Sequence, residues 1–302
     1  MTTLESARDK FVRHLESKNR AEATVVAYSK DIEQLVDFCI RNNITNTHEV
    51  SKKDIEDFLK HLSDVNYTKK TISRKINAIK TFFKYLQDEN IIENNPSQLI
   101  QHPKLEQNAP RILSKIEYRA LRDTVKEDVR TKAIVEILLQ TGIRISELAA
   151  IKIDYLKLSD NHDQESGTME IPGSNSTPGR TIPLNSAVQE AIKAYIEERP
   201  ESDTDNLFVT KTGRSLLVRN IRATLDRYFK QIGLDDVTVN DLRHTFVAEH
   251  LKRGASVLLV SKIAGHKRLT TTENYLKYID REESGVGELA ELQSKIYLTS
   301  HS

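Results

Sequence analysis

Four short segments in the second half of the sequence carry side chains that could act on a phosphodiester. They read TGIRISEL (141–148), NDLRHTF (240–246), AGHK (264–267) and TTTENYLKY (270–278). Together they offer two arginines, at least one histidine and a tyrosine, each near the expected start of a helix. Arginine suits a phosphodiester because its planar guanidinium donates two parallel charge-assisted hydrogen bonds. These residue types therefore indicate a phosphate-binding site.

The residues around each arginine predict how its side chain is presented. Gly142 allows a tight turn that projects Arg144 from the start of a helix, where the helix dipole also favours an anion. Asn240 or Asp241 can cap the next helix, which would place Arg243 in its first turn. Both arginines are thus expected at helix starts.

The other candidates lie nearer the end of the chain. Gly265 is expected to end a helix and leave His266 in a turn, and Tyr275 follows on a short helix rich in threonine. Taken singly, each residue has an ordinary explanation, because a lone histidine is usually a satisfied polar group and a lone tyrosine usually packs at a rim. The functional interpretation depends on the order and spacing of all four segments.

That order and spacing resemble the tyrosine recombinase (phage integrase) family. TGIRISEL matches the first arginine box of the family, which typically reads T-G-x-R-x-S-E-L. LRHTFVAEHLKRGA, followed by VSKIAGHKRLTTTENYLKY, matches the second box, where Arg, Gly-His and Tyr recur at this spacing. The resemblance covers the whole catalytic half of such proteins. It extends more weakly to residues 1–105, which are similar to the family's helical core-binding domain.

The resemblance implies transfer of a DNA phosphodiester to a tyrosine hydroxyl. Tyr275 would attack the scissile phosphate, form a 3′-phosphotyrosyl link and release a 5′-hydroxyl, with Tyr278 as the fallback nucleophile. Arg144 and Arg243 would neutralise the non-bridging oxygens, and His266 would hydrogen-bond the same phosphate. Such chemistry needs no cofactor and no metal, and the sequence contains no P-loop.

One departure from the family pattern concerns proton transfer. The second box of the family usually reads His-x-x-Arg, whereas the histidine position here is Asn240. Asparagine can donate a hydrogen bond to phosphate but cannot act as a general base. His244 follows Arg243 directly and matches a residue that is normally structural in the family, so geometry is needed before it can be given the missing role.

A second departure concerns the lysine that usually lies in the β-hairpin turn and protonates the leaving 5′-oxygen. The predicted hairpin, MEIPGSNSTPGRTIPL, contains no lysine, and Ser174 or Asn175 lies near the expected position. Lys157 and Lys211 are possible substitutes that the sequence does not separate. Arg180 aligns with a common family arginine ahead of the final strand, and we expect it to contact DNA.

The first hundred residues predict an all-helical domain. Apolar residues recur at helical spacing within 21–40, 52–62 and 68–87. The stretch QHPKLEQNAPR (101–111) contains two prolines and no periodicity, which indicates a linker. We therefore expect a helical core-binding, DNA-binding domain of SAM-like type over residues 1–105.

A catalytic domain is expected over residues 112–302. It starts with the capping-box pattern Ser-x-x-Glu at 114–117, and β-branched pieces within 151–184 predict a small antiparallel sheet. Helices are expected at about 129–140, 145–151, 186–198, 216–232, 241–252, 256–264 and 270–279. The tail after Gly287 carries Leu289, Leu292, Ile296 and Leu298 and predicts one last helix. The fold class is mainly α, with a mixed, mostly α catalytic domain.

Charge is balanced overall but uneven along the chain, with 45 Lys and Arg against 44 Asp and Glu. One concentration lies within 65–87 and a second within 243–268, which indicates a polyanion held between two domains. Cys39 is the only cysteine, so a disulfide framework is excluded, and no apolar run approaches the length of a membrane helix. We expect a cytoplasmic protein that does not bind membranes. The expected DNA-binding residues in the first concentration are Lys69, Lys70, Arg74, Lys75, Lys80 and Lys84.

These observations favour a site-specific DNA recombinase that works as a homotetramer on paired recognition sites in double-stranded DNA. Strand exchange needs one nucleophile per strand, and each chain supplies only one Tyr275, so four chains are expected on the DNA. The free protein is expected to be largely monomeric, because a near-neutral chain has no other evident interface. The tail would either cover its own domain or link neighbouring subunits. Two alternatives stay open: a DNA-binding relative with impaired strand exchange, and an enzyme like type IB topoisomerases.

Overall fold

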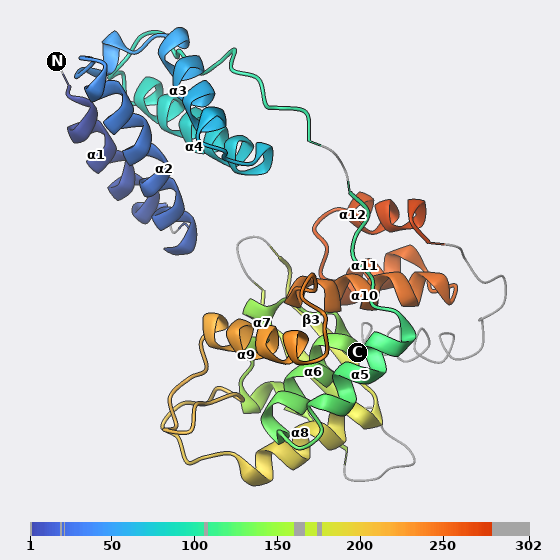
Figure 1. Ribbon diagram of the computed structural model, residues 1–302. Helices are drawn as coiled ribbons and strands as arrows, with labels where there is room; N and C mark the ends of the chain where they lie inside the picture. Colours follow the sequence, from blue (N-terminus) through green and yellow to red (C-terminus); the bar gives the residue numbers. More distant parts are fainter. Residues whose placement is uncertain are drawn as a thin grey trace. The chain divides into compact units, whose positions relative to one another are not determined.

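The computed structural model describes residues 2–18, 20, 22–105, 108–159, 167–173 and 177–279. The chain divides into two compact units, Met1–Asn108 and Ala109–Ser302 (Figure 1). The predicted tail helix and the hairpin positions Ser174 and Asn175 lie outside the described residues. Within the described part, no helix is long and apolar enough to cross a membrane.

The N-terminal unit is built from helices that bury one apolar face each. They are α1 (Leu4–Ser17), α2 (Glu22–Arg41), α3 (Lys52–Asp64) and α4 (Lys69–Asp88), with a 3₁₀ turn at Thr47–Glu49. Hydroxyl side chains cap α3 and α4: Ser51 Oγ accepts from the Asp54 N–H, and Thr68 Oγ1 accepts from the Thr71 N–H. Phe11 of α1 stacks edge-on against Phe82 of α4, which fixes the core between these helices.

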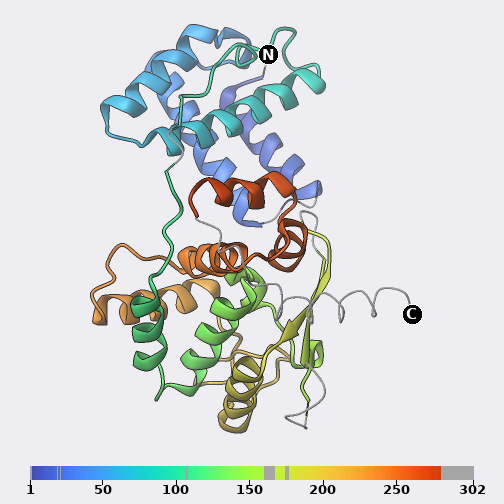
Figure 2. The same cartoon turned by 90° about the vertical axis from the view of Figure 1, so that its right-hand side faces the viewer.

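The C-terminal unit is mostly helical, with a three-stranded antiparallel sheet in the order β1-β2-β3. Figure 2 shows the sheet lying beside the helical body of this unit. The elements are α5 (Lys115–Thr124), α6 (Val129–Thr141), α7 (Ile145–Ala149), a 3₁₀ turn (Ile153–Tyr155), β1 (Leu156–Lys157), β2 (Gly167–Ile171), β3 (Arg180–Leu184), α8 (Ser186–Glu198), α9 (Val218–Gln231), α10 (Val239–Lys252), α11 (Val257–Ala264), α12 (Leu269–Glu273) and a 3₁₀ turn (Asn274–Lys277). The predicted fold class is confirmed, and so is the capping box at Ser114 and Glu117.

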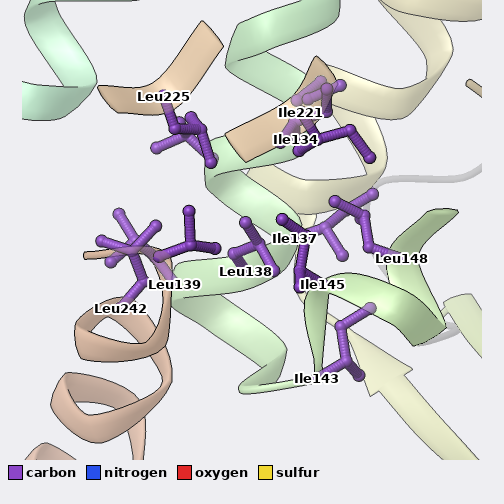
Figure 3. Close-up of a cluster of buried hydrophobic side chains, with 14 of the residues drawn as sticks. Ile134, Ile137, Leu138, Leu139, Ile143, Ile145, Leu148, Ile221, Leu225 and Leu242 are labelled. Atoms are coloured by element: carbon purple, nitrogen blue, oxygen red, sulfur yellow. The ribbon is translucent and has the colours of Figure 1, made fainter. Parts of the chain in front are cut away.

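Helix α6 forms the centre of this unit. Ile134, Ile137, Leu138 and Leu139 are each at most 3% exposed, so apolar residues occupy most sides of the helix. Figure 3 shows these residues surrounded by side chains of the following turn and α7, of α9, and of Leu242 on α10. A helix buried on most sides is a rigid support. The loop that follows α6 carries Arg144, so this arginine is presented from the end of a well-buried helix.

Candidate active site in the C-terminal unit

Glu147 joins two of the predicted arginines. Arg144 is the residue immediately before α7, and its backbone N–H and Nη1 donate to the Glu147 carboxylate at 2.8 and 3.0 Å. Arg180, at the start of β3, donates from Nη1 and Nη2 to the two oxygens of the same carboxylate at 3.0 and 2.9 Å. Burial alone would raise the pKa of Glu147, but the hydrogen bonds from Arg180 and Arg144 lower it. A carboxylate therefore fixes both guanidinium groups in place.

The turn after α11 lies against both arginines. Arg180 Nε donates to the carbonyl oxygen of Ile263 at 2.7 Å, and Arg144 Nη2 donates to that of Gly265 at 2.8 Å. Gly265 has a φ of +67°, and a Cβ there would lie 2.6 Å from Arg180 Cζ. Both the left-handed backbone and the close approach require glycine here. The residue that follows, His266, is thereby fixed beside the arginine pair.

Arg243 reaches the same region from α10. Its Nη1 donates to the carbonyl oxygen of Gly142 at 2.5 Å, and the residue is only 9% exposed. Burial and the nearby charge of Arg144 lower the pKa of Arg243 to about 10, so it remains a cation at neutral pH. Gly142 ends α6 at a φ of +61°, and a Cβ there would meet the Phe246 ring at 2.2 Å. The turn predicted at Gly142 is thus required by the packing of α10.

His266 lies in the turn after Gly265, as predicted. Its Nδ1 is 2.7 Å from Thr272 Oγ1 on α12. Burial, followed by the charges of Arg243 and Arg144, lowers the pKa of His266 to about 4. The imidazole is therefore neutral at physiological pH and can act there as a hydrogen-bond donor rather than as a cation.

Tyr275 lies in the 3₁₀ turn after α12 and is 7% exposed. Its Oη is 2.5 Å from His244 Nδ1, and its ring stacks over the His266 ring at a centroid distance of 6.4 Å. Burial raises the pKa of Tyr275, whereas the Arg243 charge lowers it and Asp241 raises it. The structure thus brings Arg243, His266 and Tyr275 into one cluster. The fallback tyrosine of the sequence, Tyr278, is 37% exposed.

Asn240 precedes Arg243 by three residues on α10, the spacing of side chains on the same face of a helix. It is exposed in the first turn of α10, and in the described part of the chain it makes no hydrogen bond to the arginines or to Tyr275. The predicted cap was wrong: Thr238 caps α10, and its N–H and hydroxyl donate to the Asp241 carboxylate. The helix therefore begins earlier than expected, and Arg243 lies in its second turn.

The lysines considered for the hairpin role lie on the surface. Lys157 is exposed on β1, where it pairs with Thr168 of β2, and Lys211 is exposed in the turn before Ser215. Neither forms an ion pair or hydrogen bond with the cluster within the described residues. The structure provides no geometric reason to prefer one of them.

Helix α4 corrects one of the predicted DNA contacts. Lys75 is only 3% exposed: its Nζ donates to Asp31 Oδ1 at 2.8 Å and to Gln34 on α2. Arg74 also pairs with Asp31, although 47% of its side chain is exposed. Lys75 therefore connects two helices and does not lie on the outer face. The remaining predicted lysines do reach solvent: Lys69, Lys70 and Lys84 are exposed and Lys80 is half-buried.

The sequence alone does not assign roles to two residues of the site, Glu147 and His244. Glu147 belongs to the TGIRISEL motif, and an acid three residues after an arginine at a helix start has the spacing of a capping ion pair. For His244, the sequence shows only a residue that is normally structural in the family, so its role depends on geometry. His244 belongs to the site because it contacts Tyr275, and the position of Tyr275 depends on how the 3₁₀ turn Asn274–Lys277 packs against α10, which no local sequence pattern reveals.

Comparison with known proteins agrees with this geometry. The profile described as "Phage integrase family" matches residues 106–282, and that described as "Phage integrase, N-terminal SAM-like domain" matches residues 9–90. The chain is 33% identical to "Tyrosine recombinase XerC" of Natranaerobius thermophilus over 272 residues, covering 85% of this chain and 89% of the relative. It is 31% identical to that of Bacillus subtilis, covering 88% and 89%.

Solved structures share the fold. XerA recombinase is 25% identical, with a TM-score of 0.52, and covers 96% of this chain and 98% of its own. The Tn1549 transposon integrase, solved with transposon right end DNA, is 18% identical with a TM-score of 0.75, covering 97% and 100%. Since a family profile matches more than half of the chain and XerC relatives align along most of its length, the protein belongs to the phage integrase family and is a tyrosine-type site-specific recombinase of the Xer kind.

Proposed function

We propose that this recombinase cleaves and rejoins double-stranded DNA through a 3′-phosphotyrosyl intermediate on Tyr275. The observation that carries the proposal is the convergence of Arg144, Arg243, His266 and Tyr275 from four separate segments onto one cluster. Glu147 carries one negative charge against the positive charges of Arg144, Arg180 and Arg243, so the site has an excess of positive charge that an anion would offset. The expected ligand is therefore anionic.

Each residue of the cluster would have its own role at the scissile phosphate. Arg144 and Arg243 would donate to the non-bridging oxygens as negative charge develops in the transition state. His266 is neutral and its Nδ1 faces Thr272, so its other ring nitrogen would hydrogen-bond the phosphate. The Arg180 guanidinium already donates to Glu147 and to the Ile263 carbonyl. Arg180 would therefore position Arg144 through Glu147 rather than contact the reacting phosphate.

The nucleophile can be tested with a nicked suicide duplex that traps the covalent adduct. Tyr275→Phe should abolish the adduct and leave DNA binding unchanged, because it removes only the hydroxyl. The matched control is Tyr278→Phe, three residues along the chain, which should form the adduct normally. An adduct that persists in Tyr275→Phe contradicts the assignment. DNA binding without any adduct in the unmodified protein would favour a relative that has lost strand exchange.

The oligomeric proposal is a homotetramer assembled on paired sites, with a monomer in the absence of DNA. Each chain would provide one Tyr275, and four strands must be cut and rejoined. The two units would both hold DNA: residues 1–105 through the exposed lysines of α4, and residues 112–302 through the cluster. Removing residues 288–302, which lie outside the described part, should preserve single-site binding and impair synapsis in a two-site assay. Normal recombination by the truncated chain would contradict the proposed role of the tail.

A further inference from the structure

The hydroxyl of Tyr275 must lose a proton when it attacks phosphorus. The residue at the position where the family usually carries a histidine is Asn240, and a carboxamide cannot accept a proton from a phenol. Asn240 is exposed, and within the described residues it forms no hydrogen bond with Tyr275. A different proton acceptor is therefore needed, provided that Tyr275 is the nucleophile as proposed above.

The side chain that contacts the Tyr275 hydroxyl is His244. Its Nδ1 is 2.5 Å from Oη, and the two ring centroids are 5.8 Å apart with the planes tilted by 44°. His244 follows Arg243 on α10, and successive side chains on a helix are rotated by about 100°. Arg243 therefore reaches the Gly142 carbonyl, whereas His244 reaches the tyrosine. One helix presents the phosphate-binding cation and the tyrosine's partner to the same site.

The charged and titratable groups around His244 favour its neutral form. Burial lowers the pKa of His244, Asp241 on the same helix raises it, and Arg243 lowers it. From the neighbouring elements, Tyr275 faces the ring across the hydrogen bond, and His266 is close enough for the two imidazoles to interact. A neutral imidazole with its proton on Nε2 leaves Nδ1 as an acceptor, which is the form that can receive the phenolic proton.

We propose that His244 is the general base that takes the proton of Tyr275. As the Oη–phosphorus bond forms, the phenolic proton passes to Nδ1 and the bond between phosphorus and the 5′-oxygen breaks. The 5′-oxygen leaves with the electron pair of that bond and takes its own proton from solvent. In the rejoining step an incoming 5′-hydroxyl attacks phosphorus and releases its proton to solvent, while His244 returns its proton to the departing phenolate.

A contact between these two side chains could instead hold Tyr275 in a resting position. The two roles predict opposite effects. A base is needed in the rate-limiting transfer, so its loss slows cleavage; a residue that only restrains the tyrosine slows cleavage when present, so its loss accelerates it. The direction of the change therefore separates them.

The experiment is single-turnover cleavage of a suicide duplex by full-length His244→Asn and His244→Ala. Asparagine keeps a polar group near the Nδ1 position but cannot take a proton, so the cleavage rate should fall by about 10²–10⁴-fold. The DNA affinity and the melting temperature should stay unchanged. The matched control is His250→Asn, another partly buried histidine of α10, whose Nδ1 lies 2.8 Å from the Phe246 carbonyl oxygen. That variant should cleave at the normal rate.

Three further readouts identify the step. In His244→Asn the cleavage rate should rise with pH as hydroxide replaces the base, whereas the unmodified protein should reach a plateau once His244 is neutral. Added imidazole should partly restore His244→Ala. A 5′-bridging phosphorothiolate, whose thiolate leaves without protonation, should not restore either variant, because it replaces an acid and not a base.

Three results would overturn the inference: unchanged cleavage in His244→Asn, faster cleavage, or full restoration by the phosphorothiolate. The unmodified protein separates this outcome from a failure of the proposed function. If it forms the adduct through Tyr275 while the His244 variants are unimpaired, only the base assignment fails. If it forms no adduct at all, the nucleophile assignment fails first.

Discussion

Glu147 is the residue on which the order of the arginine cluster depends, because it accepts from both Arg144 and Arg180. Glu147→Gln keeps the shape of the side chain but removes the negative charge between two cations. We expect the free energy of unfolding to fall by about 3 kcal/mol, since a largely buried ion pair is broken from one side. The exposed Glu190→Gln is the control and should change it by less than about 0.5 kcal/mol. Urea unfolding of both variants measures the difference, and equal stabilities would show that the arginines need no counter-charge.

The neutral histidines of the cluster make the stability depend on pH. The pKa of His266 is lowered to about 4, so between that value and the ordinary pKa near 6.5 the unfolded chain binds a proton that the folded chain does not. The free energy of unfolding should therefore be highest above about pH 6.5 and fall on acidification, by at most about 1.4 kcal/mol per pH unit for this group. Urea unfolding at pH 7, 6 and 5 tests this, and His266→Asn should reduce the slope. An identical slope in that variant would assign the acid sensitivity to other groups.

At the scale of elements, periodicity predicted most helices because their apolar faces recur every three or four residues, as on α4 and α8. It predicted a single helix at 270–279, where the structure has α12 followed by a 3₁₀ turn. The run of β-branched threonines weakens a continuous helix, and burial of Tyr275 fixes the tighter turn. The arginines, His266 and Tyr275 were found by spacing, whereas the contact of His244 required the tertiary fold.

Asp31 illustrates a feature that sequence patterns on one element do not reveal. It is 2% exposed on α2 and accepts hydrogen bonds from Arg74 and Lys75 of α4. Of these two residues of the predicted basic face, Lys75 is buried and Arg74 remains partly exposed. We expect Asp31→Asn to lower the free energy of unfolding by about 3 kcal/mol, because Lys75 loses its buried counter-charge. Asp37→Asn, on the exposed side of α2, is the control. Thermal or urea unfolding measures the effect. If Asp31→Asn lowered DNA affinity without changing the free energy of unfolding, Lys75 would have to be a DNA contact and not a structural one.

For the whole molecule, a formal charge of +1 means that attraction to DNA cannot come from net charge. The attraction must come from local basic surfaces, and the exposed lysines of α4 form one of them. In the C-terminal unit, Arg253, Lys262, Lys267 and Arg268 are exposed along the second basic concentration, whereas Arg243 is buried in the cluster. Binding would thus combine phosphate contacts from both units with the chemistry of one site.

The salt dependence of DNA binding tests this distribution of charge. Each phosphate contact releases counterions, so losing one contact should reduce the slope of log affinity against log salt by about 0.9. Replacing the exposed Lys69 and Lys70 by Glu should therefore weaken binding at low salt and reduce the slope by about 2. The same change at Lys53 and Lys60, exposed lysines of α3, alters the net charge equally and should leave the slope unchanged if binding is local. Equal losses in the two double variants would mean that α4 does not face the DNA and that only overall charge matters.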